Sequence, residues 1–540
     1  MKYVKKLAGL MLAMVMALAM SATTFAADTH TYEIYQIFTG DYSEGILSNV
    51  KWGQNGTGTQ REAVDETTLT ALENVASATS DTAKLAVINT YADLTGTPYT
   101  TGAANKYEHL PNGYYLVKDQ DGTQNGENQF YTLYIVQVVN GTLEFTPKGD
   151  VPEVEKKIVE GENKVDVNEA SIGATVNYEI TGKLPTDFAD YNEYYYVFTD
   201  TLSKGLTYKN DVKVTIGGVD LTSYFFTAAT DYSQTAGTTI TVGIQDIKAL
   251  NNLENVTVDK DSKIIVTYSA TVNENAVIAG EGNKNDVQLA YSNDPNNSGE
   301  GTKLPPTPEP EEPTPTHPSG ETPKDEVVTY TTELTILKTD EAKKILPGAE
   351  FTLTGNGVNV VLVTTEIFTE DTDGAYWKLK NGTYTTTAPV IADDETDNSA
   401  DYDSTTTKYS KSTVVEAKET GKDETSVVGV IDAEGHVTFS GLGAGTYTIT
   451  ETKTPAGYNT IAPITFKLTF NAETKLFASD NEDIKVGEDN KLDTTIVNKK
   501  GSTLPSTGGM GTTVFYVVGS ILLVGAAVLL IAKTRMRSTK

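Results

Sequence analysis

Apolar and polar residues alternate along most of this chain, with the period expected of half-buried β-strands. The alternation begins at 32–38 and returns at 113–118 and 130–139. Between these stretches apolar residues recur at helical spacing, namely Leu69, Leu72, Val75, Leu85, Ile88 and Tyr91. We therefore predict a mixed α+β domain over residues 27–150.

Two further stretches consist of alternating segments separated by Gly, Asn and Asp turns. We predict β-sandwiches over residues 151–300 and 327–500, so that the fold class is mainly β. An acidic insertion rich in Thr and Ser, near 391–411, should form an exposed loop on the second sandwich. Residues 301–326 are rich in Pro, Glu and Thr, which predicts an extended, semi-rigid linker between the two sandwiches.

Both ends of the chain have the features of processing segments. Residues 1–26 combine a basic start, an apolar stretch and small residues, which predicts a secretory signal peptide cut after Ala26 or Ala27. In the last segment, 501–540, the apolar run 514–532 is long enough to cross a bilayer as a helix, and a basic tail follows it. We expect an exported chain with its C-terminus held in the cytoplasm.

Charge and composition exclude several classes of function. Removing the seven basic residues of the two end segments takes the formal charge from −31 to −38, which argues against nucleic acid or an anionic membrane as a partner. The four histidines are scattered without metal spacing, and no metal or cofactor is indicated. Because the exported chain has no cysteine, it must be braced by something other than disulfides.

Strand alternation places polar side chains on apolar faces in both sandwiches. In the second sandwich, Lys338 shares a face with Leu334 and Ile336, and Glu451 shares one with Tyr447 and Ile449. Each sandwich thus directs one lysine, one acid and one asparagine toward its core, which are Lys156, Asp200 and Asn285 in the first and Lys338, Glu451 and Asn498 in the second. Lys157 is the rival of Lys156, although its neighbours make a poorer core face.

Isolated buried charges are costly, so these residues must pair or become neutral. One solution is a salt bridge beside a hydrogen-bonded asparagine. The other is chemical, because apolar surroundings favour a neutral amine next to a protonated acid. The amine can then attack the asparagine side-chain carbonyl carbon and release ammonia, leaving an intramolecular isopeptide bond. Alternation by itself leaves both solutions open.

The stretch 451–458 resembles the E-box of pilin domains of the collagen-binding-protein B type (CnaB-type). Residues 337–340 and Asn498 match the partners of that box, while 200–206 and 285–293 resemble the acid and asparagine strands of the companion CnaA-type domain. The resemblance implies tandem Ig-like sandwiches, CnaA-type then CnaB-type. It also implies self-formed Lys–Asn bonds, with Asp200 or Glu451 as the assisting acid.

The segment Leu504-Pro505-Ser506-Thr507-Gly508 resembles a cell-wall sorting signal of Gram-positive bacteria. In that family a sortase cleaves between the Thr and the Gly, here Thr507 and Gly508, and transfers the Thr carbonyl to an amine. Residues 143–148 resemble the pilin motif, which implies Lys148 as the acceptor amine, although Thr146 stands where the motif has Tyr. Lys106 and Lys118 are the other candidates.

Taken together, these resemblances imply the backbone (shaft) pilin of a sortase-assembled pilus on the wall of a Gram-positive bacterium. The expected partners are a pilus sortase and a housekeeping sortase, neighbouring copies of the chain, minor tip and base pilins, and peptidoglycan, with host ligands left open. The chain is expected to be a sortase substrate and no enzyme beyond its own cross-linking. The alternative is a wall-anchored adhesin or minor pilin that is never polymerised.

Overall fold

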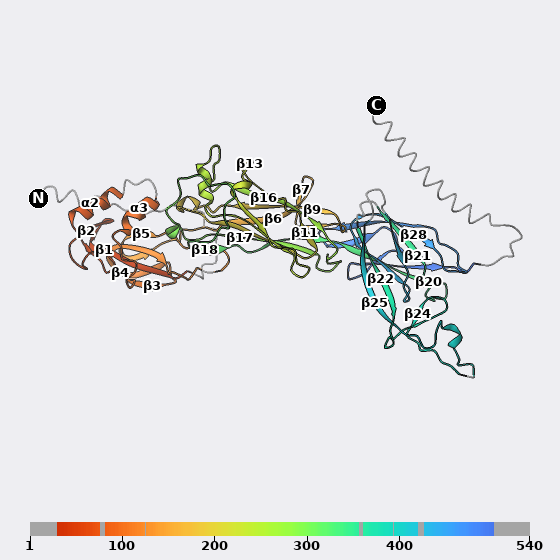
Figure 1. Ribbon diagram of the computed structural model, residues 1–540. Helices are drawn as coiled ribbons and strands as arrows, with labels where there is room; N and C mark the ends of the chain where they lie inside the picture. The colour runs from red at the N-terminus through yellow and green to blue at the C-terminus, as the bar shows by residue number, and fades with distance from the viewer. Residues whose placement is uncertain are drawn as a thin grey trace, which may run out of the picture.

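The computed structural model describes residues 30–75, 81–124, 126–355, 360–392, 394–419 and 426–501. These residues form three domains that follow one another along an elongated molecule (Figure 1). The predicted signal peptide, the sorting segment at 504–508 and the expected membrane helix at 514–532 lie outside the described residues. In the described part of the chain, no helix is both long and apolar enough to span a bilayer.

The first domain is a five-stranded antiparallel sheet, in the order β2-β1-β4-β5 with β3 beside β1, accompanied by two helices. The first helix begins after Asp65, whose carboxylate accepts a hydrogen bond from the Thr68 amide at 2.9 Å. Leu72, Leu85 and Ile88 from the helices are buried with the sheet, as their spacing predicts. The elements are β1 Tyr32–Ser43, β2 Ile46–Trp52, α2 Glu66–Val75, α3 Asp81–Asn89, β3 Thr100–Gly102, β4 Lys106–Asp119 and β5 Ile135–Glu144.

The middle domain is a sandwich of two seven-stranded sheets, ordered β14-β15-β10-β17-β19-β8 with β18 beside β17, and β13-β12-β16-β9-β6-β7 with β11 beside β16. Their inward residues form one core. The strands are β6 Glu153–Glu160, β7 Asn163–Val165, β8 Val167–Glu169, β9 Thr175–Lys183, β10 Tyr196–Leu202, β11 Leu206–Tyr208, β12 Lys213–Ile216, β13 Val219–Asp220, β14 Phe226–Ala229, β15 Thr238–Ile244, β16 Lys263–Val272, β17 Asn283–Ser292, β18 Ser319–Glu321 and β19 Asp325–Tyr330. Short 3₁₀ helices are η1 Phe188–Asp190, η2 Thr222–Tyr224, η3 Ile247–Asn252 and η4 Pro295–Asn297.

The third domain packs a six-stranded sheet, β25-β22-β27-β20-β32-β31, on a five-stranded one, β26-β21-β28-β29-β30. Its strands are β20 Thr332–Asp340, β21 Glu350–Gly355, β22 Val360–Glu370, β25 Tyr409–Glu419, β26 Ser426–Val430, β27 His436–Leu442, β28 Gly445–Lys453, β29 Ile464–Asn471, β30 Leu476–Ser479, β31 Lys485–Val486 and β32 Leu492–Asn498. The long β22–β25 ribbon carries β23 Trp377–Lys378, β24 Tyr384–Thr385 and η5 Ser399–Asp401 away from the sandwich (Figure 1). The predicted fold class, tandem sandwiches after a mixed α+β domain, is confirmed.

The Pro-rich stretch differs from the extended, semi-rigid linker expected between the two sandwiches over 301–326. Glu309 donates its amide to the Ser223 carbonyl at 2.8 Å, and Thr314 donates its amide to Gln245 Oε1 at 3.0 Å, so the run lies along the middle domain. Between Pro318 and Pro323, β18 pairs with β17 of that domain, and after Pro323, the last proline, β19 also adds to β17. Proline cannot donate to a ladder, but the proline-free, β-branched sequence that follows can extend an open sheet edge.

The middle and third domains are joined by strand rather than by linker. Strand β19 belongs to the middle domain, β20 belongs to the third, and only Thr331 separates them. Val327 packs in the middle core, whereas Val328 and Tyr330 pack in the third. The junction of the two domains therefore passes through consecutive core residues.

The first domain is docked on the middle one by the stretch just before β5. Phe130 is buried in the middle-domain core, and Tyr131 donates its amide to the Asn293 carbonyl at 2.7 Å. Asn296 accepts from the Tyr134 amide at 2.9 Å and donates to the Thr132 carbonyl at 2.9 Å. These contacts explain why the strand expected at 130–139 begins only at Ile135: the earlier residues are used for docking.

A partly buried acid beside this junction should make stability depend on pH. Burial, with Asp150 and Asp190 nearby, raises the pKa of Asp187 to about 8. The folded chain therefore keeps a proton that the unfolded chain releases, so this contribution is complete below about pH 4 and is lost as the pH rises toward about 8. We predict that Asp187→Asn raises the free energy of unfolding at pH 8 by roughly 2 kcal/mol and flattens its pH profile, measured by denaturant titration.

Asp220 provides a control of opposite sign, because hydrogen bonds from Thr222 hold the pKa of its carboxyl below the usual range. Asp220→Asn should not raise stability at pH 8. If the free energy of unfolding of Asp187→Asn fell with rising pH as steeply as that of the parent chain, the prediction would be contradicted.

Candidate functional sites

The middle domain brings Lys156, Asp200 and Asn285 together in its core. Lys156 lies on β6 of one sheet, whereas Asp200 and Asn285 lie on the neighbouring strands β10 and β17 of the facing sheet. None of the three is more than 1% exposed. Strand alternation therefore points all three side chains into the space between the sheets, as the sequence predicts.

A tyrosine hydroxyl links these three side chains. Lys156 Nζ donates to the Asp200 carboxylate and, at 2.7 Å, to Tyr268 Oη. Tyr268 Oη donates to Asp200 Oδ1 at 2.8 Å and accepts from Asn285 Nδ2 at 2.7 Å. Sequence reasoning missed Tyr268, on β16. Its alternation with the buried Ile264 and Val266 would have placed it on the core face but could not reveal the partner of its hydroxyl.

Burial sets the protonation of this group. Removal from water lowers the pKa of Lys156 and raises that of Asp200, so the pair is biased toward a neutral amine and a protonated acid. Asn285 Oδ1 is buried and has no hydrogen-bond partner among the residues that the structure describes. The set thus places a nucleophile near an amide whose carbonyl oxygen can still accept a hydrogen bond.

The structure separates Lys156 from its rival Lys157. The Lys157 side chain is 25% exposed and pairs with Glu155 at 3.1 Å and Asp166 at 2.6 Å. These surface carboxylates raise the pKa of Lys157 and hold it as a cation. Only Lys156 of the two faces the core.

The third domain assembles its set differently. Lys338 and Asn498 come from adjacent parallel strands of one sheet, β20 and β32, and Glu451 comes from β28 of the facing sheet. Asn498 Nδ2 donates to Glu451 Oε1 at 2.8 Å, and Glu451 Oε2 accepts from the Ile461 amide at 3.0 Å. All three side chains are buried.

The side-chain nitrogen of Lys338 contacts backbone carbonyls rather than a carboxylate. Its Nζ donates to the Ile496 carbonyl at 3.1 Å and to the Thr339 carbonyl at 3.3 Å. Burial lowers the pKa of Lys338, which favours the neutral amine. Asn498 Oδ1, like Asn285 Oδ1, has no hydrogen-bond partner within the described ranges. Among the described residues Lys338 thus forms no salt bridge with Glu451, whereas Lys156 forms one with Asp200.

Among the candidate acceptor lysines, Lys148 lies on the segment between the first two domains. Its amide donates to Thr132 Oγ1 at 2.6 Å, its carbonyl accepts from the Leu133 amide at 2.7 Å, and the residue is half-buried. The backbone therefore fixes the position of Lys148 relative to the docking stretch of the first domain.

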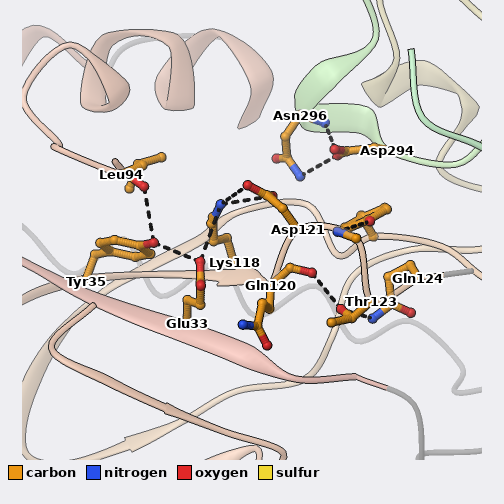
Figure 2. Close-up of polar contacts among 12 residues, drawn as sticks. Glu33, Tyr35, Leu94, Lys118, Gln120, Asp121, Thr123, Gln124, Asp294 and Asn296 are labelled. Atoms are coloured by element: carbon orange, nitrogen blue, oxygen red, sulfur yellow. Dashed lines mark hydrogen bonds and ion pairs between the residues drawn. The ribbon is translucent and has the colours of Figure 1, made fainter. Parts of the chain in front are cut away.

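Of the two other candidate lysines, Lys118 is buried and Lys106 is exposed. Figure 2 shows Lys118 directed at Glu33 and Asp121, with its Nζ 3.0 Å from Asp121 Oδ1 and 3.4 Å from Glu33 Oε2. Lys118 is only 5% exposed, so its amine is enclosed. Lys106 lies on the surface of the first domain, 3.4 Å from Glu108. The sortase residues Leu504, Pro505, Thr507 and Gly508 lie outside the described residues.

In the described part of the chain, one group of three carboxylates has the spacing of a possible metal site. Glu366, Asp432 and Glu434 lie close enough together to surround a cation. Lys411 forms ion pairs with Glu366 and, at 3.1 Å, with Glu434, so a lysine already supplies positive charge there.

Comparison with protein families matches three parts of the chain. Residues 172–295 match the Gram-positive pilin backbone subunit 2, Cna-B-like domain, and residues 403–483 match a prealbumin-like fold domain of the SpaA model. Residues 496–539 match the LPXTG cell wall anchor motif. The middle domain, expected to be CnaA-type, contains the stretch that matches a model described as Cna-B-like, and its assignment to the A type stays a prediction.

Similarity to individual proteins extends over most of the chain. The chain is 26% identical over 442 residues to the trypsin-resistant surface T6 protein of Streptococcus pyogenes serotype M6, covering 76% of this chain and 74% of that protein. Among solved structures, the T6 backbone pilin of serotype M6 Streptococcus pyogenes is 16% identical with a TM-score of 0.44, covering 88% of this chain and 97% of that one. The major pilin SpaA of Corynebacterium diphtheriae is 17% identical with a TM-score of 0.42, covering 87% and 95%.

Proposed function

We propose that Thr507 of one shaft subunit is joined to Lys148 of the next. The backbone-pilin domain and the LPXTG anchor make this chain a cell-wall-anchored surface pilus protein of a Gram-positive bacterium, and this is the basis for the proposed joint. A pilus sortase would recognise the motif that begins with Leu504-Pro505 and cleave it between Thr507 and Gly508. It would then transfer the Thr507 carbonyl to the Lys148 amine. A housekeeping sortase would attach the finished fibre to peptidoglycan, and minor tip and base pilins would complete it.

The observation that carries this proposal is the position of the two buried sets relative to the proposed joint. Lys148 lies where the first domain meets the middle one, and the described chain leaves the third domain at the far end of the molecule (Figure 1). Tension between these points runs through the middle and third domains, and each of these domains contains one Lys–acid–Asn set. The first domain lies off that path.

We further propose that each set reacts once to form an isopeptide bond. The neutral lysine Nζ attacks the asparagine Cγ, a new C–N bond forms, the bond from Cγ to Nδ2 breaks, and ammonia leaves with one proton from Nζ. In the third domain the bond would join β20 to β32, the first and last strands, which are parallel neighbours. In the middle domain it would join the two sheets through β6 and β17.

The runner-up function is a wall-anchored adhesin or minor pilin with the same domains. Such a protein would accept no further subunit through Lys148. Wall extracts run on a denaturing gel separate the two functions, since a shaft subunit gives a ladder of covalent multimers. A single wall-linked band would contradict the shaft assignment.

Intact-mass measurement tests the internal bonds. We predict that the secreted mature ectodomain is lighter than its sequence mass by two molecules of ammonia, because each proposed bond releases one. Asp200→Ala and Glu451→Ala should each recover one ammonia, since without its acid the set cannot neutralise or polarise its partners. A wild-type chain of full sequence mass would refute the cross-links.

A further inference from the structure

A single hydroxyl contacts every reacting group of the middle-domain set. Tyr268 Oη lies 2.7 Å from Lys156 Nζ, 2.7 Å from Asn285 Nδ2 and 2.8 Å from Asp200 Oδ1. The attacking nitrogen, the leaving nitrogen and the acid are therefore all hydrogen-bonded to the same oxygen atom.

The third domain connects its acid to its asparagine without such a hydroxyl. There the acid is a glutamate, and Asn498 Nδ2 donates to it directly at 2.8 Å. Asp200 is one methylene shorter, and the hydrogen bonds recorded for its carboxylate in the described structure go to Lys156 and Tyr268. In the middle domain, the acid thus reaches the asparagine through Tyr268.

The environment keeps Tyr268 protonated and fixed. Burial, with Asp200 nearby, raises the pKa of its hydroxyl well above the usual value, so the group remains able both to donate and to accept. Its ring stacks on that of Tyr178, with centroids 5.2 Å apart and planes 27° apart. A held, neutral hydroxyl between two nitrogens is suited to proton transfer.

We propose that Tyr268 is a catalytic residue for formation of the Lys156–Asn285 bond, relaying a proton from the attacking nitrogen to the leaving one. This inference rests on the proposed cross-link. As Lys156 Nζ bonds to Asn285 Cγ, its surplus proton passes to Tyr268 Oη, and the hydroxyl proton passes to Nδ2 directly or by way of Asp200. Ammonia then leaves and the tyrosine is regenerated, so the step needs no co-reactant.

Tyr268→Phe tests the relay while keeping the stacked ring. The full mature chain is expressed as a short pulse, and its intact mass and proteolytic cross-linked peptides are followed with time. We expect the Lys156–Asn285 bond to form at least about 100-fold more slowly in Tyr268→Phe, the size typical of a lost acid–base group. Tyr196→Phe is the matched control and should react as the wild type does, because this buried hydroxyl of the same core donates to the Lys183 carbonyl at 3.3 Å and contacts none of the three side chains. The Lys338–Asn498 bond in the same molecules is an internal reference and should be unaffected.

The outcomes separate this inference from the cross-link itself. A wild-type chain without the Lys156–Asn285 bond would overturn the proposed cross-link. A wild-type chain that forms the bond while Tyr268→Phe forms it equally fast would overturn only the role of Tyr268. If Tyr268→Phe does not fold, a fluorinated tyrosine at position 268 keeps the shape and changes the acidity of the hydroxyl. A changed rate then supports the relay, and an unchanged rate overturns it.

Discussion

Lys148→Arg should abolish the ladder of covalent multimers and leave only monomer attached to the wall. Transfer of the Thr507 carbonyl requires a neutral primary amine, and the guanidinium of arginine stays protonated at any physiological pH. Arginine keeps the positive charge and nearly the length of lysine, so the substitution removes the nucleophile with little other change. The measurement is a denaturing gel of wall extracts from cells that make each variant.

Lys106→Arg is the matched control, since Lys106 lies exposed on the same first domain beside Glu108. It should leave the ladder unchanged. Intact mass of the Lys148→Arg ectodomain, still short by two ammonias, would show that the variant is folded. If the ladder survives Lys148→Arg but disappears with Lys106→Arg, Lys106 and not Lys148 is the acceptor.

Glu451→Gln should remove the third-domain cross-link and lower the free energy of unfolding of that domain by about 5 kcal/mol, the loop-entropy value for a cross-link that closes a loop of this size. Glutamine keeps the shape of the side chain but cannot act as an acid. Without the bond, β20 and β32 would be held only by their ladder and by packing. Denaturant unfolding measures the loss of stability. Single-molecule stretching between residues 148 and 501 should show a third-domain unfolding step that the wild type lacks.

Glu333→Gln controls for loss of a carboxylate on the same sandwich. Glu333 lies on β20 and pairs with Lys491 at 2.7 Å, outside the buried set. Its loss should cost less than about 1 kcal/mol, as expected for a pair near the surface, and should keep the missing ammonia. A Glu451→Gln chain that is still lighter than its own sequence mass by two ammonias, with wild-type extensibility, would contradict the role of Glu451.

Much of the fold could be predicted from local pattern. Alternation identifies Lys156 and Lys338 as core-facing lysines because the two faces of a strand are set by parity, a property of neighbouring residues. The helices of the first domain were likewise visible in the spacing of Leu72, Leu85 and Ile88. The course of the Pro-rich stretch was not predicted, because local composition does not say which sheet edge lies open to receive β19.

Strand parity shows which side chains enter each core, and the sorting motif and its candidate acceptors can be read directly from the chain. The contacts that those side chains make become known only once the strands are packed together. Tyr268 is brought to Lys156 from a distant strand, and Lys118 is enclosed by Glu33 and Asp121. The difference lies in separation along the chain. Strand parity is fixed by adjacent residues, whereas hydrogen-bond partners and burial depend on how strands far apart in the chain pack together.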